Sequence, residues 1–338
     1  MTGNFMRILF AAAATIALAT ASVAQEAEAP PPSPGQIFNA APVEDWVVID
    51  PEDLVVMTLQ PLEDGTERKV VMQLISEPFS QGWVENIRTL ARSEYWDGSM
   101  ILRVQDNYVV QWGQPDPEMG VEPKPVPDGL KAPSENEYTA GSPNWLTGSV
   151  TAAKRQPRVI GEWPAPIMTD AYADFSSFRD GWPIAGIQGM HLARQWPVHC
   201  YGMVGVGRGM SPDTGDGSQL YTVIGHAPRH LDRNIAVVGR IVEGIEHLSS
   251  LPRGKGPLGF YEDESKRVPI VSVRMAADLP DSEQPRFEYL STESGSFAAY
   301  AGARANRRDP FFITPAGGAD ICNIPVPVRS FDVIAEDQ

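Results

Sequence analysis

Short apolar runs separated by turn residues dominate the first part of the chain. The segments 53–59 (DLVVMTL) and 69–75 (KVVMQLI) are rich in β-branched and apolar residues, and the Asp-Gly pair of EDGTE lies between them. This combination predicts a β-hairpin. Two further β-type runs flank QDN within 99–113 (SMILRVQDNYVVQWG). This first part of the chain is therefore predicted to be rich in strands.

One amphipathic helix is predicted between these strands. In 80–96 (SQGWVENIRTLARSEYW), apolar side chains recur at helical spacing on one side, at Trp83, Ile87, Leu90 and Ala91. Arg88 and Arg92 fall on the other side, as expected for a helix with one buried face.

β-type runs return later in the chain. They are HCYGMVGVG (199–207), QLYTVIG (219–225), IAVVGRIVEG (235–244) and RVPIVSVRMA (267–276). Short helical patches fit APRHLDR and GIEHLSSLP between them. Several antiparallel strands with only two convincing helices predict a mainly β fold, a closed β-barrel with two capping helices.

Prolines interrupt this pattern between residues 114 and 197, where no long periodic segment occurs. We interpret 114–197 as a long insertion, partly ordered by its Trp and Tyr residues, because a structureless loop of this length is unusual inside a compact domain. It divides a domain that spans 46–277. Residues 278–338 are predicted to form a C-terminal extension packed on that domain, since about 60 residues alone give a marginal core.

The first 24 residues have the three parts of a secretory signal peptide. One Arg precedes an apolar run from Ile8 to Ala19, and small residues end at Ala24, where cleavage is expected. A retained membrane anchor is the alternative, but the run is too short to span a bilayer. We expect export to the periplasm without stable membrane insertion after the signal is removed. Residues 25–45, acidic and Pro-rich, are interpreted as a linker without structure of its own.

Composition changes the picture in two respects. The 338 residues carry a formal net charge of −16, which argues against a nucleic-acid partner because phosphate binding needs clustered Lys and Arg. Only two cysteines occur, Cys200 and Cys322, and an exported chain meets an oxidising compartment. Either they form the single disulfide available, or both are buried free thiols; the sequence favours neither.

Three kinds of site suggested by short motifs are disfavoured. A hydrolase triad would need Ser218, His226 or His230, and Asp232, but GSQ lacks the flanks of a nucleophile elbow. The two histidines have metal-ligand spacing, yet Pro228 between them breaks the helix that such ligation requires. The glycines of GVGRG (205–209) precede MSPDTGDG instead of the helix that follows a dinucleotide-binding loop. No metal and no cofactor are expected.

Three stretches taken together resemble the cyclophilins. In VENIRTLARSEYWDGSMILRVQDNYVVQWG (84–113), a helix ending in Tyr and Asp-Gly leads to a strand like the family's Phe-His-Arg-Val. GMVGVGR (202–208) resembles its Ser-Met-Ala-Arg strand, and GSQLYTVIGHAPRHLDRNIAVVGRIVEGIEHL (217–248) resembles its Gly-Ser-Gln-Phe-Phe strand and following hairpin. The resemblance covers roughly 53–275, apart from the insertion. It implies an eight-stranded antiparallel barrel with two helices and peptidyl-prolyl cis/trans isomerase activity.

The resemblance also implies a set of site residues. The family's catalytic arginine falls on Arg103, and its groove residues fall on Tyr108, Val109, Gln111, Gly207, Arg208, Gln219, Tyr221 and Leu231. The Trp usual in the family aligns near His230, and the His after its Leu-Asp-Gly turn aligns with Ile235. Without the resemblance, a solvated arginine on a barrel strand and ordinary barrel packing would explain the same positions.

Some of these positions depart from the family pattern. Phe-His before the arginine is Ile101-Leu102 here, Phe-Met of the groove floor is Tyr108-Val109, and the second Phe of Phe-Phe is Tyr221. A tyrosine hydroxyl in a proline-binding groove adds a polar atom that needs a partner.

We expect an isomerase that assists the folding of exported proteins by binding their proline-containing segments. A cyclophilin-like module that binds such segments with little turnover is the alternative.

Overall fold

The computed structural model describes residues 30–114, 122, 124–141, 168–187 and 194–331. The expected signal peptide (1–24) and its cleavage site therefore lie outside the described residues, as do parts of the predicted insertion.

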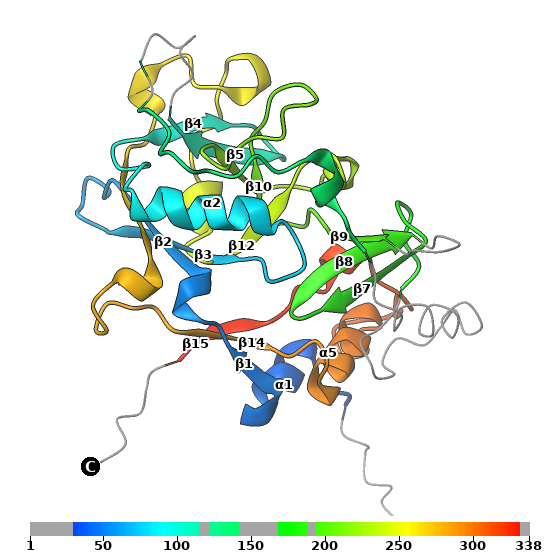
Figure 1. Ribbon diagram of the computed structural model, residues 1–338. Helices are drawn as coiled ribbons and strands as arrows, with labels where there is room; N and C mark the ends of the chain where they lie inside the picture. Colours follow the sequence, from blue (N-terminus) through cyan, green and yellow to red (C-terminus); the bar gives the residue numbers. More distant parts are fainter. Residues whose placement is uncertain (1–29, 115–121, 123, 142–167, 188–193, 332–338) are drawn as a thin grey trace, which may run out of the picture.

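Eight antiparallel strands form the barrel in the upper part of Figure 1. Along the sheet their order is β13 (Ile270–Met275), β2 (Leu54–Leu59), β3 (Arg68–Leu74), β12 (Val237–Glu243), β10 (Met203–Val206), β11 (Leu220–Val223), β5 (Val109–Gly113) and β4 (Met100–Val104). The two ends of this sheet meet, because Ile101 N–H donates to the Val268 carbonyl and Ile270 N–H to the Ser99 carbonyl, both at 2.8 Å. The predicted mainly β barrel is confirmed, and each strand coincides with a segment predicted from the sequence to within one residue.

The strand β2 is apolar on both faces, and the structure explains why. Alternate side chains enter the main core inside the barrel, namely Val55, Met57 and Leu59. The residues between them, Leu54 and Val56, pack in a second cluster with Phe287, which comes from the C-terminal extension. A strand covered on both faces is expected to be a continuous apolar run instead of an alternating one. The extension thus accounts for the sequence DLVVMTL.

The helix α2 (Gln81–Arg92) lies across one face of the barrel (Figure 1). Its side chains Trp83, Ile87 and Leu90 are fully buried. On the other side, Arg88 and Arg92 pair with Asp53 and Glu52, which precede β2. The predicted amphipathic helix is confirmed. A second short helix, α4 (Glu246–Ser249), follows β12, within the predicted helical patch GIEHLSSLP.

The two ends of the chain form a second layer beneath the barrel. A three-stranded sheet has the order β1 (Trp46–Val48), β14 (Phe287–Leu290), β15 (Val328–Ser330). The helix α1 (Pro34–Asn39) packs on α5 (Gly295–Ala305), where the rings of Phe38 and Tyr300 lie 6.1 Å apart. One expectation is corrected here, because the predicted linker 25–45 contains the helix α1. The strand β1, at the start of the predicted domain 46–277, pairs with β14 of the extension.

A capping motif explains why α1 begins at Pro34, although the surrounding segment is rich in proline. Ser33 and Gln36 form a reciprocal capping box: the Ser33 hydroxyl accepts from Gln36 N–H at 3.3 Å, and the Gln36 side chain accepts from Ser33 N–H at 2.8 Å. Pro34 occupies the first helical turn, where its missing N–H costs nothing.

The described part of the predicted insertion also contains a small sheet. Its strands have the order β6 (Ala140–Gly141), β9 (Arg194–Pro197), β8 (Trp182–Ile187), β7 (Phe175–Arg179). Phe178 of β7 lies 4.8 Å from Phe297 of α5, measured between ring centroids. The insertion and the chain ends therefore meet beside the barrel, as Figure 1 shows.

Two contacts join these added segments to the barrel. Cys200, just before β10, forms a disulfide with Cys322 of the C-terminal extension, so neither is a free thiol. The Arg240 side chain of β12 lies between Trp182 of β8 and Tyr289 of β14, 4.6 and 5.8 Å from their ring centroids. It also donates to the Gly181 carbonyl at 2.8 Å. Burial lowers the pKa of Arg240 to about 10.

No helix among the described residues combines the length and the apolar character needed to cross a lipid bilayer.

Candidate functional site

Strand register brings four of the barrel residues into one row. Arg103 on β4 lies opposite Gln111 on β5, Gln111 lies opposite Tyr221 on β11, and Tyr221 lies opposite Gly205 on β10. Directly opposed residues of antiparallel strands point to the same face of a sheet. The register therefore places a guanidinium, an amide and an aromatic ring side by side on one face of the barrel.

The Arg103 side chain is held in place by several partners. Its Nε donates to the Leu258 carbonyl at 2.6 Å, its Nη1 donates to Gln111 Oε1 at 3.2 Å, and its Nη2 donates to Gln105 Oε1. The guanidinium carbon lies 5.7 Å from the ring centroid of Tyr108 and 5.6 Å from that of Phe260.

Burial lowers the pKa of Arg103. A guanidinium has five N–H groups, so three hydrogen bonds leave two that the described residues do not engage. Arg103 is thus a fixed positive charge with free donors.

An apolar cluster lies beside this charge. Its buried members are Val109, Tyr221 and Val223, and its partly buried members are Tyr108, Leu231 and Ile235. Five of these six residues were assigned to the groove from the sequence; Val223 is the addition. The structure brings them together on the outer side of the barrel sheet, in a cluster separate from the main core.

A second amide extends the polar edge of the site. Gln111 Nε2 donates to Gln219 Oε1 at 2.8 Å, so Arg103, Gln111 and Gln219 form one hydrogen-bonded series. Gly207 N–H donates to the Gln219 carbonyl at 2.8 Å, and a Cβ on Gly207 would lie 3.1 Å from Gln219 Cβ. The glycine therefore lets β10 approach the glutamine closely.

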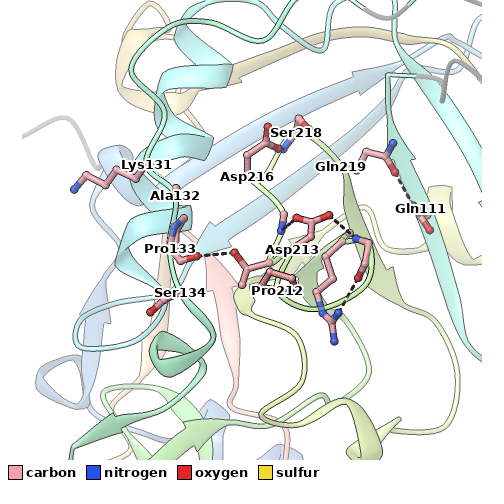
Figure 2. Close-up of a pocket in the computed structure, with 15 residues that line it drawn as sticks. Gln111, Lys131, Ala132, Pro133, Ser134, Pro212, Asp213, Asp216, Ser218 and Gln219 are labelled. Carbon is pink, nitrogen blue, oxygen red and sulfur yellow. Dashed lines mark hydrogen bonds between the residues drawn. The ribbon is translucent and has the colours of Figure 1, made fainter.

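A pocket of about 830 Å³ adjoins this edge (Figure 2). Gln111 and Gln219 line one side, and the segment Lys131–Ser134 of the predicted insertion lines another. Thr214 fixes that segment, because its hydroxyl donates to the Pro133 carbonyl at 2.6 Å. The insertion therefore contributes a wall of the pocket.

The tyrosine hydroxyl that the sequence left without a partner is satisfied in the structure. Tyr221 is buried, and its hydroxyl lies 2.8 Å from Nε2 of His199. The two rings are stacked with an interplanar angle of 9°. Burial raises the pKa of Tyr221 well above its usual value, so this side chain is a neutral phenol.

His230 and Arg208 lie at the margins of the site. The exposed ring of His230 stacks on Tyr108, with centroids 6.1 Å apart and an interplanar angle of 7°. Arg208 donates to the backbone carbonyls of Asn234 at 2.9 Å and Gly209 at 2.7 Å. Both were assigned to the groove from the sequence, and both remain next to it.

The disfavoured hydrolase residues do not form a triad in the structure. Asp232 is buried and bonds to His199 and Arg229, whereas His226 and His230 are exposed. Ser218 contributes its backbone carbonyl to Trp96, whose indole N–H lies 2.8 Å away. Within the described residues, no group of three or more His, Cys, Asp or Glu side chains could hold a metal ion.

Besides Val223, two residues that contact this site were missed from the sequence. His199 begins a β-type run, and no local pattern links it to a tyrosine 22 positions later. Phe260 lies in a Gly- and Pro-rich stretch and meets Arg103 through its ring and through an isolated bridge between the two backbones. Neither carries a short-range signal, because both contacts depend on how distant strands pair.

Comparison with known proteins agrees with this geometry. A family model described as cyclophilin type peptidyl-prolyl cis-trans isomerase/CLD matches residues 69–275, a range that contains every groove residue discussed above. No match was found among the curated proteins.

Two solved structures were compared, and the first of them shares the fold. The cyclophilin AquaCyp293 from Hirschia baltica is 22% identical, with a TM-score of 0.60 over 85% of this chain and 93% of its own. A cyclophilin type peptidyl-prolyl cis-trans isomerase of Cryptosporidium parvum, crystallised in the presence of the dipeptide ala-pro, is 12% identical, with a TM-score of 0.35 over 66% of this chain and 98% of its own. The family model covers well over half of the 338 residues. The chain therefore belongs to the family of cyclophilin-type peptidyl-prolyl cis-trans isomerases.

Proposed function

We propose that this isomerase acts on proline-containing segments of exported proteins, and that Arg103 stabilises the twisted X-Pro bond. The single observation that carries the proposal is the position of Arg103. Its guanidinium is fixed by three hydrogen bonds beside an apolar cluster, and two of its N–H groups remain for a substrate.

The reaction needs a charge of this kind instead of a nucleophile. Amide resonance gives the X-Pro bond a rotation barrier of about 18 to 20 kcal/mol, while its cis and trans forms differ by about 1 kcal/mol or less. Rotation by a quarter turn breaks the resonance and leaves a lone pair on the proline nitrogen. A guanidinium that donates to this nitrogen binds the twisted state better than either planar state, which lowers the barrier.

The remaining groove residues would hold the peptide on either side of the bond. Tyr108, Tyr221 and Leu231 offer an apolar surface of the kind that a pyrrolidine ring requires. The amides of Gln111 and Gln219 carry donors and acceptors for backbone groups of the peptide. The adjoining pocket of about 830 Å³ has room for a neighbouring side chain.

Export is supported by the sequence of the N-terminus and agrees with the cysteines. The signal-like segment 1–24 predicts a mature chain that begins at Gln25 in the periplasm. The Cys200–Cys322 disulfide is a bond that an oxidising compartment maintains.

Turnover of a proline-containing peptide by the purified mature chain tests the activity. We expect isomerisation well above the uncatalysed rate, under the same conditions in which the peptide binds. Peptide binding without turnover would contradict the proposal and favour a binding module. For the location, the mass of the protein recovered from the periplasmic fraction should correspond to a chain starting at Gln25; an intact N-terminus would contradict export with cleavage.

A further inference from the structure

A series of buried polar groups leads from the floor of the groove into the interior. The Tyr221 hydroxyl contacts His199 Nε2, and His199 Nδ1 lies 2.9 Å from Asp232 Oδ1. Asp232 Oδ2 accepts from Arg229 Nε at 2.7 Å. Arg229 then donates both Nη groups to Asp170, at 2.9 and 3.0 Å. The side chains of the four residues that follow Tyr221 in this series are at most 3% exposed, so these groups are shielded from water.

The far end of this series belongs to segments added to the barrel. Asp170 lies in the predicted insertion, shortly before β7, and Tyr172 of the same segment places its ring 4.9 Å from the Arg229 guanidinium. Asp320 of the C-terminal extension lies 4.0 Å from Arg229 Nη1. His199 is adjacent to Cys200 of the disulfide. The groove floor is thus connected to the insertion and to the extension.

The hydrogen bonds fix the direction in which the Tyr221 hydroxyl points. Burial opposes the charge on Asp232, but the hydrogen bonds from His199 and Arg229 outweigh it and hold the pKa of this carboxyl below its usual value. An ionised carboxylate only accepts, so a neutral His199 ring carries its proton on Nδ1. Its Nε2 is then an acceptor, and the Tyr221 O–H donates to it. The hydroxyl proton is directed away from the apolar cluster.

We propose that His199 is a positioning residue for proline binding, which keeps the Tyr221 hydroxyl turned into the protein while the insertion fixes His199 through Asp170, Arg229 and Asp232. This inference rests on the proposed role of the groove. Without the acceptor, the buried hydroxyl must either remain unpaired or recruit water beside the site of the pyrrolidine ring. Both outcomes weaken the binding of the proline ring more than they change the catalytic step at Arg103.

The experiment tests the roles of the two ring nitrogens of His199 separately. The amide of His199→Asn occupies the position of Nδ1 and keeps the bond to Asp232, but it leaves Tyr221 without a partner. We expect KM, and the Kd of a proline-containing peptide measured by titration, to rise about 5- to 100-fold, the range for one buried group left unpaired. We expect kcat to stay within about 3-fold. In a Tyr221→Phe background, which has no hydroxyl to satisfy, the same substitution should change KM by less than about 2-fold.

A matched variant keeps the inference testable if His199→Asn folds poorly. The longer amide of His199→Gln reaches the position of Nε2 and can still accept from Tyr221, although it loses the bond to Asp232, so KM should rise less than it does with His199→Asn. An equal rise in KM from His199→Asn in both backgrounds would overturn the inference, as would a fall in kcat at unchanged KM, or an equal rise from His199→Gln.

A substitution at Asp170 tests whether the insertion helps to hold His199 in place. Asp170→Asn should raise KM in the parent by several fold and leave KM nearly unchanged in the Tyr221→Phe background. Equal effects in both backgrounds would overturn this step. A parent chain that binds peptide through a His199-dependent contact but shows no turnover would contradict the proposed function, and would leave the positioning role of His199 supported.

Discussion

A Cβ atom on Gly205 would lie 2.4 Å from the ring of Tyr221, a separation that real Cβ contacts do not show. Gly205 stands directly opposite Tyr221 on the neighbouring strand, so the absence of a side chain on β10 is what admits the aromatic ring. The position of Tyr221 in the groove therefore depends on a glycine that contributes no group of its own.

Gly205→Ala should displace the Tyr221 ring and weaken peptide binding. We expect KM to rise about 10-fold or more, because an added methyl in a filled site forces neighbouring groups to move at a cost of about 1 to 3 kcal/mol. The matched control is Gly318→Ala, where no atom lies within 4 Å of the added Cβ. Steady-state kinetics on a proline-containing peptide measures both. An unchanged KM for Gly205→Ala would show that Tyr221 does not form the binding surface.

The disulfide predicts a large effect on stability. Cys200 and Cys322 are 122 positions apart, and a crosslink that closes a long loop restricts the unfolded chain strongly. Replacing both cysteines by serine should lower the free energy of unfolding by about 2 to 5 kcal/mol. Urea unfolding measures the change. Adding a reductant should destabilise the parent by a similar amount and leave the double variant unchanged; equal stability of the two proteins without reductant would contradict the prediction.

The barrel was predictable because its strands carry local signals. Runs such as KVVMQLI combine β-branched residues with turn residues at both ends, and the helix over 81–92 has a periodic apolar face. The groove residues were predicted from the resemblance of these segments to the cyclophilins. Once the strands pair in this order, the register places Arg103, Gln111 and Tyr221 in one row.

The added segments were not predictable in the same way. β1 and β15 have three residues each, and β1 pairs with β14 across most of the length of the chain. The helix α5 (GSFAAYAGARA) is rich in Gly and Ala and has no marked apolar stripe. Its stability comes from packing against distant residues such as Phe178, which no local pattern records. His199 was missed for the same reason, since all its side-chain partners come from other segments.

The buried carboxylate of Asp232 predicts a dependence of stability on pH. Its pKa in the folded chain lies below the ordinary value of 3.8, so its contribution is fully present above that pH and is lost as the pH falls through the folded-state pKa. At pH 7, Asp232→Asn should lower the free energy of unfolding by about 3 kcal/mol, because it leaves buried charge uncompensated.

Urea unfolding of the parent and of Asp232→Asn between pH 7 and pH 3 tests this. The difference between the two should be constant near neutral pH and should shrink below about pH 4. As a control, Asp106→Asn removes an exposed carboxylate paired with Arg253 and should change stability by less than about 1 kcal/mol. A difference for Asp232→Asn that stays constant down to pH 3 would contradict the assignment of an ionised, hydrogen-bonded carboxylate.

Arg103→Ala tests the central claim most directly. Losing one preorganised group that meets charge developed in the transition state costs about 2 to 4 kcal/mol, so kcat/KM should fall about 30- to 1000-fold. Peptide Kd should change far less, because the apolar residues remain. Arg103→Lys keeps the charge without the planar fork and should stay well below the parent. Arg308→Ala, at an exposed arginine in the C-terminal extension, should match the parent. An Arg103→Ala variant whose kcat/KM equals that of the parent would contradict the proposed mechanism.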